Sequence, residues 1–282
     1  MKLIIFAFLL LVTSQTLFAD NTSRIELPIG SFGGRPTIDI SLNNSEPFSV
    51  IIDTGLGGAE LMLSSDKAKQ LKLPETGVNE MNNLGGGQTL EITQHAAEQV
   101  MVGDATFNFN RISSHIMTMF TSPDAPEGVL SAWALSPGVI TVDLMRQVIS
   151  IDKEHELKDG SENTLELNTQ DSLPSFKILI NEQEYDAHID TGSPIGLSLP
   201  LNLKSSFDYV EEPKVIGKAR IPGHEIDIWE GRIAGSVELG SIVFENPVVK
   251  FLAPLRWVNI GAEIIKNHPV SIDMENGYIQ FN

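Results

Sequence analysis

The sequence feature that most constrains the fold is one short motif that occurs twice. An aspartate followed by Thr-Gly ends an apolar run in "FSVIIDTGLGGAELML" (48–63) and again in "DAHIDTGSPIGLSLP" (186–200). The two aspartates are Asp53 and Asp190, at an offset of 137 positions. Each copy predicts a strand that ends in a turn at the aspartate.

The similarity between the two regions extends well beyond the motif. The same offset aligns Gly103 with Gly240, and residues 129–151 align without a gap with residues 259–281 at an offset of 130. The change of offset means that the first half carries seven extra residues, which we place in residues 113–128. The chain is therefore predicted to be a duplication with two halves of the same fold.

Each half is predicted to consist mostly of strands. Residues 36–53 alternate apolar and polar side chains around a turn at Asn43–Asn44, and residues 174–190 repeat this pattern with a turn near Asn181. Residues 64–73 begin with serines that can cap a helix and continue with helix formers, so one short helix is expected there.

The predicted organisation has four parts. Residues 1–19 are predicted to be a signal peptide that ends at Ala19, because the apolar run after Lys2 is too short to span a membrane. The other three parts are an N-terminal lobe (20–151), an acidic linker (152–172) and a C-terminal lobe (173–282). The mature protein is expected to be periplasmic or secreted, without stable membrane insertion, and monomeric because one chain supplies both halves of the site.

The composition excludes several classes of function. The formal charge is -18, with 37 acidic residues against 19 basic ones, so the surface repels nucleic acid and anionic lipid. The absence of cysteine excludes thiol nucleophiles and thiolate metal sites, and the six histidines show no metal-binding spacing. We therefore expect no nucleic-acid partner, no metal and no cofactor.

Two such motifs can support acid–base catalysis by a pair of carboxylates. Two carboxylates held together share a proton and titrate as a coupled pair. The ionised member can then take a proton from water while the protonated member polarises a carbonyl group. Asp53 and Asp190 are therefore the candidate catalytic residues. Glycine admits close backbone approach and a threonine hydroxyl can join two turns, so the candidates for setting the site geometry are Thr54, Gly55, Thr191, Gly192 and Ser193.

The sequence resembles the aspartic peptidases of the pepsin and retropepsin group, most closely the bacterial retropepsin-like proteins with two fused lobes. The resemblance rests on the doubled Asp-Thr-Gly, the glycine-rich stretch 84–92 and an apolar element late in each half, and it covers the chain from about residue 24. It implies an all-β fold of two related, closed-barrel-like lobes with pseudo-twofold symmetry and a cleft between them. It also implies that the two aspartates hold a common water, beneath a flap that contains Gly85, Gly86 and Gly87.

Two positions depart from the pattern of this family. Leu56 follows the first motif where a small residue is usual, and Ser131 stands where the late element has glycine. A hydroxyl after the motif can donate a hydrogen bond to an ionised carboxylate, which Ser193 can do and Leu56 cannot. We therefore hypothesise that Asp190 is the more readily ionised member and that Asp53 holds the proton.

The predicted function is an exported aspartic endopeptidase that hydrolyses a peptide or unfolded protein. Water between the two aspartates would attack the peptide bond with general acid and base assistance. One alternative is a catalytically weak, peptidase-like protein that binds or inhibits peptides, proteins or other enzymes. A second alternative is a secreted β-rich structural module in which the two turns only stabilise strands.

Other conspicuous residues have structural explanations that we favour. His188 lies two residues before the second aspartate, but packing is the preferred interpretation because the first half has Ile51 there. Packing is likewise preferred over a substrate subsite for "HIMTMF" (115–120). Asp143 and Asp273 occupy equivalent positions late in each half and are expected to form structural hydrogen bonds.

Overall fold

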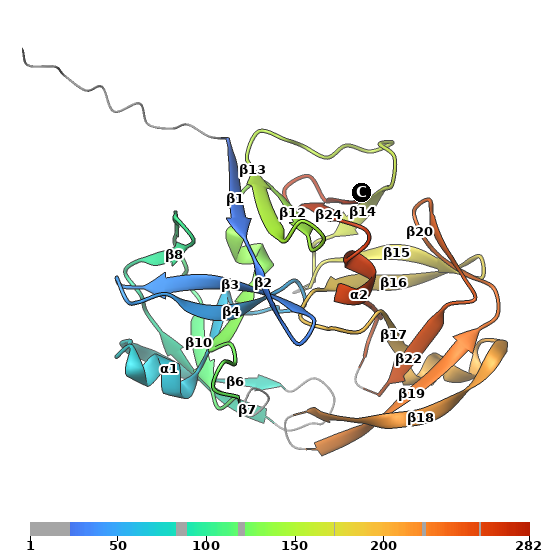
Figure 1. The fold of residues 1–282 in the computed structure, drawn as a ribbon, viewed down its shortest axis with the longest axis horizontal. Helices are drawn as coiled ribbons and strands as arrows, with labels where there is room; N and C mark the ends of the chain where they lie inside the picture. The colour runs from blue at the N-terminus through green and yellow to red at the C-terminus, as the bar shows by residue number, and fades with distance from the viewer. Residues whose placement is uncertain (1–22, 83–88, 118–121, 172, 222–223, 254) are drawn as a thin grey trace, which may run out of the picture.

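Strands make up most of the computed structural model, which describes residues 23–282 except 83–88, 118–121, 172, 222–223 and 254 (Figure 1). The predicted signal peptide and the predicted flap glycines, Gly85, Gly86 and Gly87, lie outside the described residues. Within the described part of the chain, no helix has the length and hydropathy required to cross a membrane.

The first half of the chain forms a ten-stranded sheet. Its strands are β2 (Gly30–Phe32), β3 (Arg35–Leu42), β4 (Phe48–Asp53), β5 (Leu61–Ser64), β6 (Glu75–Asn82), β7 (Thr89–His95), β8 (Val100–Val102), β9 (Ala105–Phe107), β10 (Ile112–His115) and β11 (Gly128–Ser131). They pair in the order β6-β7-β10-β5-β11-β4-β3-β8-β9, with β2 added to β3. Among the described residues, β6 and β9 are therefore the two ends of this order, and no pairing between them closes the sheet into the barrel that the resemblance implies.

The second half builds the same arrangement from nine strands of a larger sheet. They are β15 (Ser175–Ile180), β16 (Gln183–Asp190), β17 (Leu197–Pro200), β18 (Tyr209–Ile221), β19 (His224–Ile233), β20 (Ser236–Leu239), β21 (Ile242–Glu245), β22 (Val248–Leu252) and β23 (Val258–Gly261). In the first half β11 lies parallel to β4 and antiparallel to β5, and in the second β23 lies parallel to β16 and antiparallel to β17. The repeated pairing confirms an all-β fold of two related lobes.

A six-stranded sheet joins the two lobes. Its strands are β1 (Arg24–Pro28), β12 (Val139–Asp143), β13 (Val148–Asp152), β14 (Thr164–Asn168), β24 (Val270–Asp273) and β25 (Tyr278–Phe281). The order is β1-β13-β12-β24-β25-β14, so β12 and β24 meet at the centre. There Thr141 lies opposite Ser271, and their hydroxyl oxygens are 2.8 Å apart. This pair marks the pseudo-twofold axis that relates the halves.

The segment predicted as a linker, 152–172, contains part of this joining sheet. β14 pairs antiparallel with β25 through its first residues and with β15 through its last two. Its residues, Thr-Leu-Glu-Leu-Asn, alternate polar and apolar side chains as a strand does, but its partners are the C-terminal strand and the first hairpin of the second lobe. The acidic composition of the segment describes its exposure to solvent rather than an absence of secondary structure.

The two predicted hairpin turns are present. Asn43 and Asn44 have φ angles of 50° and 61°, and Asn181 and Glu182 have angles of 51° and 64°. Two successive residues with positive φ are the mark of the tight turn whose twist matches that of paired strands. Asparagine tolerates this conformation better than most residues, which explains why both hairpins reverse at asparagine.

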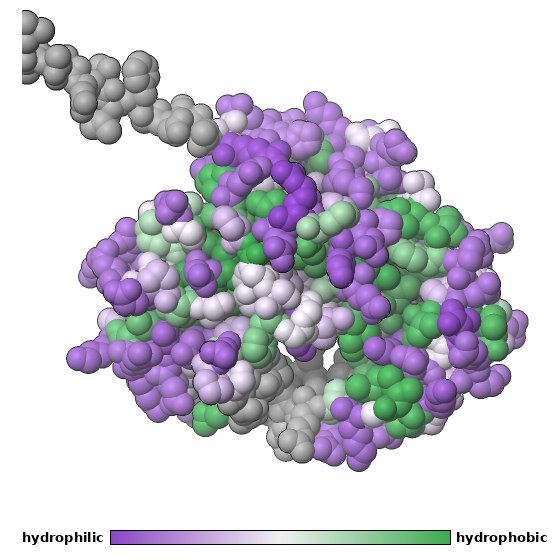
Figure 2. All heavy atoms as spheres, in the orientation of Figure 1, coloured by the Kyte–Doolittle hydropathy of each residue, from purple (hydrophilic) through white to green (hydrophobic). Residues whose placement is uncertain are grey.

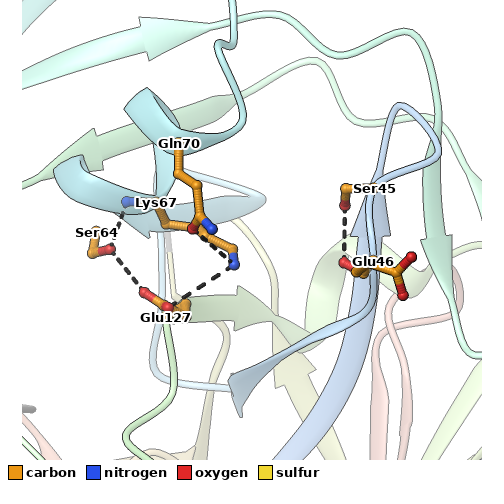
Figure 3. A network of polar contacts seen from close by, with 6 residues as sticks. All are labelled: Ser45, Glu46, Ser64, Lys67, Gln70 and Glu127. Atoms are coloured by element: carbon orange, nitrogen blue, oxygen red, sulfur yellow. Dashed lines mark hydrogen bonds and ion pairs between the residues drawn. The ribbon is translucent and has the colours of Figure 1, made fainter. Parts of the chain in front are cut away.

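The predicted helix is α1 (Ser65–Gln70), which begins after the capping residue Ser64. The Ser64 hydroxyl oxygen accepts a hydrogen bond from the backbone N–H of Lys67 at 3.1 Å, and the hydroxyl donates to Glu127 at 3.3 Å. The Lys67 ammonium group lies 3.9 Å from Glu127 and 3.3 Å from the Gln70 side-chain oxygen (Figure 3). Since Glu127 directly precedes β11, these contacts tie α1 to the strand beside β4.

Three further short helical elements follow strands. They are the 3-10 helices η1 (Ala132–Leu135) and η2 (Leu201–Ser205) and the helix α2 (Ala262–Ile265). α2 and η1 are equivalent, since each begins directly after the strand that pairs with the motif strand of its lobe.

The joining sheet should contribute strongly to stability. Ile272 is completely buried at its centre, whereas Ile216 on β18 is 45% exposed. Ile272→Ala should lower the free energy of unfolding by about 2–5 kcal/mol because it leaves a cavity. Ile216→Ala should lower it by less than about 1 kcal/mol. Urea denaturation of both variants provides the comparison, and equal losses would contradict this account of the joining sheet.

Candidate active site

Asp53 and Asp190 lie at equivalent strand ends, the last residues of β4 and β16. The parallel neighbour of each strand ends at the same level. Asp53 lies opposite Ser131, the last residue of β11, and Asp190 lies opposite Gly261, the last residue of β23. The two strand ends face each other across the pseudo-twofold axis, and the side chains of the two aspartates form a hydrogen bond. The structure therefore brings the two predicted carboxyl groups together.

The glycine of each motif allows this close approach. The backbone N–H of Gly55 donates to Asp53 Oδ1 at 2.6 Å, and the N–H of Gly192, from the other lobe, donates to the same oxygen at 3.2 Å. A Cβ at Gly55 would lie 2.9 Å from the carboxyl carbon of Asp190, and one at Gly192 would overlap the carboxyl group of Asp53. Any larger residue at either position would push the carboxyl groups apart.

The two threonines join the motifs by reciprocal hydrogen bonds. The Thr54 hydroxyl donates to the carbonyl oxygen of Ile189 at 2.8 Å, and its oxygen accepts from the N–H of Thr191 at 3.0 Å. The Thr191 hydroxyl donates to the carbonyl oxygen of Ile52 at 2.8 Å and accepts from the N–H of Thr54 at 3.1 Å. Both threonines are only 1% exposed. Each lobe thus satisfies buried backbone groups of the other.

The electrostatic consequence of this arrangement is a raised pKa at Asp53. Burial is the largest cause, followed by the charge of Asp190 and the hydrogen bond with it, and together they raise the pKa of Asp53 well above its ordinary value. The N–H donors of Gly55 and Gly192 act in the opposite direction. The raised pKa favours the protonated form of Asp53, which is the direction that the asymmetry of the two motifs predicts.

The hydrogen-bond donor to Asp190 differs from the one expected from the sequence. The side-chain amide of Asn259, on β23, donates to Asp190 Oδ2. Ser193, the expected donor, bonds through its backbone among the described residues: its N–H donates to the carbonyl oxygen of Asp190 at 3.1 Å, and its carbonyl accepts from Ala262 at 2.8 Å. The sequence indicates Asn259 in one way only: the repeat aligns this polar residue with the apolar Val129 of the first half.

The departures at Leu56 and Ser131 belong to a difference between the lobes in how the loop after the motif packs against the end of the neighbouring strand. The Ser131 hydroxyl donates to the carbonyl oxygen of Leu56 at 3.0 Å, which fixes the loop after the first motif. In the second lobe the loop passes so close to Gly261 that a Cβ there would overlap the carbonyl oxygen of Ile195. One lobe therefore requires glycine at this place, while the other fills the wider gap with a serine.

Two further residues that the sequence did not indicate hold the motif loops. Arg35, on the β2–β3 hairpin of the first lobe, donates from Nε to the carbonyl oxygen of Gly192 at 2.7 Å. Trp133, on η1, donates from its indole N–H to the carbonyl oxygen of Thr54 at 2.9 Å. The first bond crosses between the lobes, so the second motif is positioned partly by the first half of the chain.

A small apolar cluster separate from the main core lies beside the first motif. Its buried members are Ala59, Met62 and Ile92, and Leu56 and Met117 pack against them. Met117 belongs to "HIMTMF", of which only residues 115–117 are described. Of the two described apolar side chains of that segment, Met117 packs next to the motif loop, whereas Ile116 is 77% exposed, so packing accounts for only one of them.

The late aspartates form structural hydrogen bonds. Asp143 accepts from the N–H of Arg146 at 2.9 Å. Asp273 accepts from the N–H of Leu157 at 3.0 Å and from the N–H and amide of Asn276 at 3.0 and 2.8 Å. Burial opposes ionisation of Asp273, but the hydrogen bonds outweigh it and lower its pKa. In the described ranges, no group of three or more His, Asp or Glu side chains could hold a metal ion.

Two long hairpins lie on the same side of the molecule, below the paired motifs in the view of Figure 1. They are β6–β7 in the first lobe and β18–β19 in the second, and they occupy the same place in the order of each half. In the space-filling view an opening lies between the two lobes, above the β18–β19 hairpin (Figure 2). Beside the second motif loop, Ile195, Glu230, Arg232 and Glu263 border a pocket of about 710 Å³.

The chain has a two-lobed, all-β, pepsin-like fold with an aspartate from each lobe at its centre. The structure is similar to the crystal structure of basic 7S globulin from soybean, with a TM-score of 0.50, 13% sequence identity, and coverage of 92% of this chain and 94% of that chain. At this identity the similarity shows the fold alone. No protein-family model matches the chain, and no curated protein matches it in sequence.

Removal of one threonine hydroxyl should weaken the junction between the lobes. Thr191→Val leaves the N–H of Thr54 and the carbonyl of Ile52 buried without partners, so the free energy of unfolding should fall by about 2–4 kcal/mol. Thr191→Ser keeps the hydroxyl and should stay within about 1 kcal/mol of wild type. Thr106→Val, on the exposed strand β9, is the matched control in urea denaturation and should change stability little. A Thr191→Val loss no larger than this control would refute the role.

The raised pKa of Asp53 predicts a definite dependence of stability on pH. The folded protein holds this proton to a higher pH than the unfolded chain, so its contribution is complete below the ordinary pKa of about 3.9 and is lost as pH rises through the raised value. Asp53→Asn should remove that decline and become more stable relative to wild type as pH rises. Urea denaturation from pH 4 to 8 measures the difference.

Asp273 supplies a control in which the dependence of stability on pH has the opposite sign. Its pKa is lowered, so its contribution is present above the ordinary value and is lost as pH falls. Asp273→Asn should therefore destabilise the protein at neutral pH, and the difference from wild type should shrink on acidification. A parallel pH dependence for the two variants would exclude the assigned proton on Asp53.

Proposed function

We propose that this protein is an exported aspartic endopeptidase, related to the retropepsin-like peptidases with two fused lobes. The observation that carries the proposal is the contact between two carboxyl groups on equivalent strand ends, which together with burial raises the pKa of Asp53. A half-buried acid pair, held by backbone N–H groups at Asp53 and by a side-chain amide at Asp190, is arranged for general acid–base catalysis at a pH near its own titration. The predicted signal peptide is the basis for proposing export.

The first chemical step uses both members of the pair. Water bound between them gives a proton to the Asp190 carboxylate, and its oxygen attacks the carbonyl carbon of the peptide bond. The Asp53 carboxyl group donates its proton to the carbonyl oxygen as the new carbon–oxygen bond forms. The product of this step is a neutral tetrahedral diol, so no charge has to accumulate on the substrate oxygen.

The second step reverses the proton transfers. The protonated Asp190 gives its proton to the amide nitrogen, the carbon–nitrogen bond breaks, and one hydroxyl of the diol returns a proton to Asp53. A carboxylic acid and an amine leave, and the pair regains its starting state. Both protons needed for the cycle come from the attacking water and the pair itself.

The proposed substrate is an extended peptide or an unfolded segment of a protein. An extended chain can add to exposed strand edges through main-chain hydrogen bonds while alternate side chains enter pockets. The hairpins β6–β7 and β18–β19 are the proposed edges, since one comes from each lobe on the side of the opening. The apolar cluster around Met62 lies beside the first motif and suits an apolar side chain of the substrate.

A second candidate function is binding or inhibition with little turnover. Leu56 and Ser131 differ from the motif of active relatives, and the similar soybean protein is named as a globulin rather than as a peptidase. A protein of this kind would use the same opening to hold a peptide or a partner protein. The catalytic proposal is preferred because both carboxyl groups and all four hydrogen bonds of the threonines are in place.

The test is cleavage of a denatured protein mixture by the mature protein between pH 3 and 7. Wild type should cleave it, and Asp53→Asn and Asp190→Asn should each lower the rate by at least about 10³-fold, the scale of losing a general acid or base. Asp186→Asn, an exposed aspartate on the same strand as Asp190, is the matched control and should cleave like wild type. Cleavage that survives in either dyad variant excludes the mechanism.

The binding alternative has its own outcome. A folded wild-type protein that cleaves nothing across this range but retains a labelled unfolded peptide would support it over catalysis. Binding that persists in Asp53→Asn, measured by fluorescence anisotropy, would then show that the opening acts without the acid pair.

A further inference from the structure

Three polar side chains lie in a row across the second lobe next to Asp190. Asn259 on β23 is the register partner of His188 on β16 and of Ser198 on β17. Register partners project to the same face of a sheet, and Asp190 lies on that face because it is two residues beyond His188. We refer to His188, Asn259 and Ser198 as the polar row.

The polar row is buried and incompletely hydrogen-bonded. Its exposed fractions are 9% for His188, 5% for Asn259 and 1% for Ser198. His188 Nδ1, Asn259 Oδ1 and Ser198 Oγ have no hydrogen-bond partner among the described residues. A buried polar atom without a partner costs about 1–3 kcal/mol. Each of these three atoms therefore carries a cost that an apolar side chain would not.

The first lobe shows that the fold does not need this polarity. The positions equivalent to the polar row are Ile51, Val129 and Met62, which pair with one another in the same register. All three are apolar, although they stand beside Asp53 on an otherwise equivalent frame. The polar row is therefore specific to the side of Asp190.

The hydrogen bonds to the two aspartates differ accordingly. Asp53 accepts from the backbone N–H groups of Gly55 and Gly192, which the chain provides whatever the side chains are. Asp190 accepts from the side-chain amide of Asn259. An N–H donor stabilises the ionised form of a carboxyl group because that form is the stronger acceptor.

The other charged and titratable groups around Asp190 do not supply this donor. Burial lowers the pKa of His188, although the charge of Asp190 partly offsets it, so the imidazole is neutral at neutral pH. Arg35 reaches the site from β3 but bonds to the carbonyl oxygen of Gly192. Lys250, the next residue beyond Ser198 across the sheet, has its ammonium group 4.0 Å from Glu230. Asp53 is itself a carboxyl group, and burial and the charge of Asp190 raise its pKa.

We propose that Asn259 is a positioning residue that keeps the negative charge on Asp190 and thereby leaves the proton on Asp53. The inference rests on the proposed function, in which Asp190 is the base and Asp53 the acid. Asn259 touches neither water nor substrate in this role and acts through Asp190. The polar row thus breaks the symmetry of a duplicated site and assigns different tasks to two otherwise equivalent carboxyl groups.

The direct test is a titration of the two carboxyl groups by NMR in protein labelled with ¹³C at the aspartate carboxyl carbons. Spectra of Asp53→Asn and Asp190→Asn assign the two signals, and the variant to titrate is Asn259→Val, which copies Val129 of the first lobe. The lower of the two midpoints should rise by about one pH unit, a tenfold change in proton affinity. The acidic limb of the pH–rate profile should move up by the same amount.

Two further variants separate positioning from packing. Ser198→Ala removes a buried hydroxyl of the polar row that does not bond to Asp190, and it should leave the lower midpoint unchanged. Asn259→Ala removes the amide with a smaller side chain and no donor, and it should raise the midpoint as Asn259→Val does, which keeps the test available if valine prevents folding. A folded Asn259 variant with the wild-type midpoint overturns the proposal, as does an equal rise in Ser198→Ala.

The titration needs no turnover, so it distinguishes this proposal from the proposed function. A raised midpoint in a protein that cleaves nothing would keep Asn259 as the positioning residue and reject the peptidase. Cleavage by wild type together with an unchanged midpoint in both Asn259 variants would keep the peptidase and reject the role of Asn259.

Discussion

The reciprocal hydrogen bonds of Thr54 and Thr191 are the constraint on which the rest of the structure depends. Each hydroxyl satisfies one buried N–H and one buried carbonyl group of the opposite lobe, so the lobes cannot separate without stranding these groups away from water. The same bonds fix the strand ends at which the aspartates stand. The six-stranded joining sheet supplies the wider framework, and its central pair, Thr141 and Ser271, repeats the symmetry.

The duplication gives both halves one frame, and the functional differences lie in what each half places on it. The first lobe surrounds its aspartate with apolar side chains such as Val129 and Met62, whereas the second provides Asn259 and Ser198 at the same places. Two carboxyl groups in contact cannot both ionise at low cost, so a small difference in surroundings suffices to decide which one is charged. Symmetry brings the acids together, and asymmetry gives them separate roles.

Local patterns in the sequence predicted much of the fold. The repeat was visible when the two halves were aligned. The turns at Asn43 and Asn181 and the capped helix after Ser64 depend on interactions within a few residues. β14 was not predicted, because the acidic composition of its segment indicated a linker and outweighed the short alternation of Thr164–Asn168; its pairing with β15 and the distant β25 is a long-range contact. Composition indicated the exposure of that segment and carried no information about its long-range partners.

The sequence by itself determined the members of the site that occur twice, namely the aspartate, threonine and glycine of each motif. A duplicated chain marks such residues, because chance does not place them at the same point of two halves. Only the tertiary structure decided which side chains act on the pair from elsewhere. Asn259 lies 69 positions from Asp190 and Arg35 lies 157 positions from Gly192. The duplication does not mark Asn259, since the first half has Val129 at the equivalent position. Such residues become neighbours only when sheet pairing and lobe contact bring separate strands together, which no local pattern records.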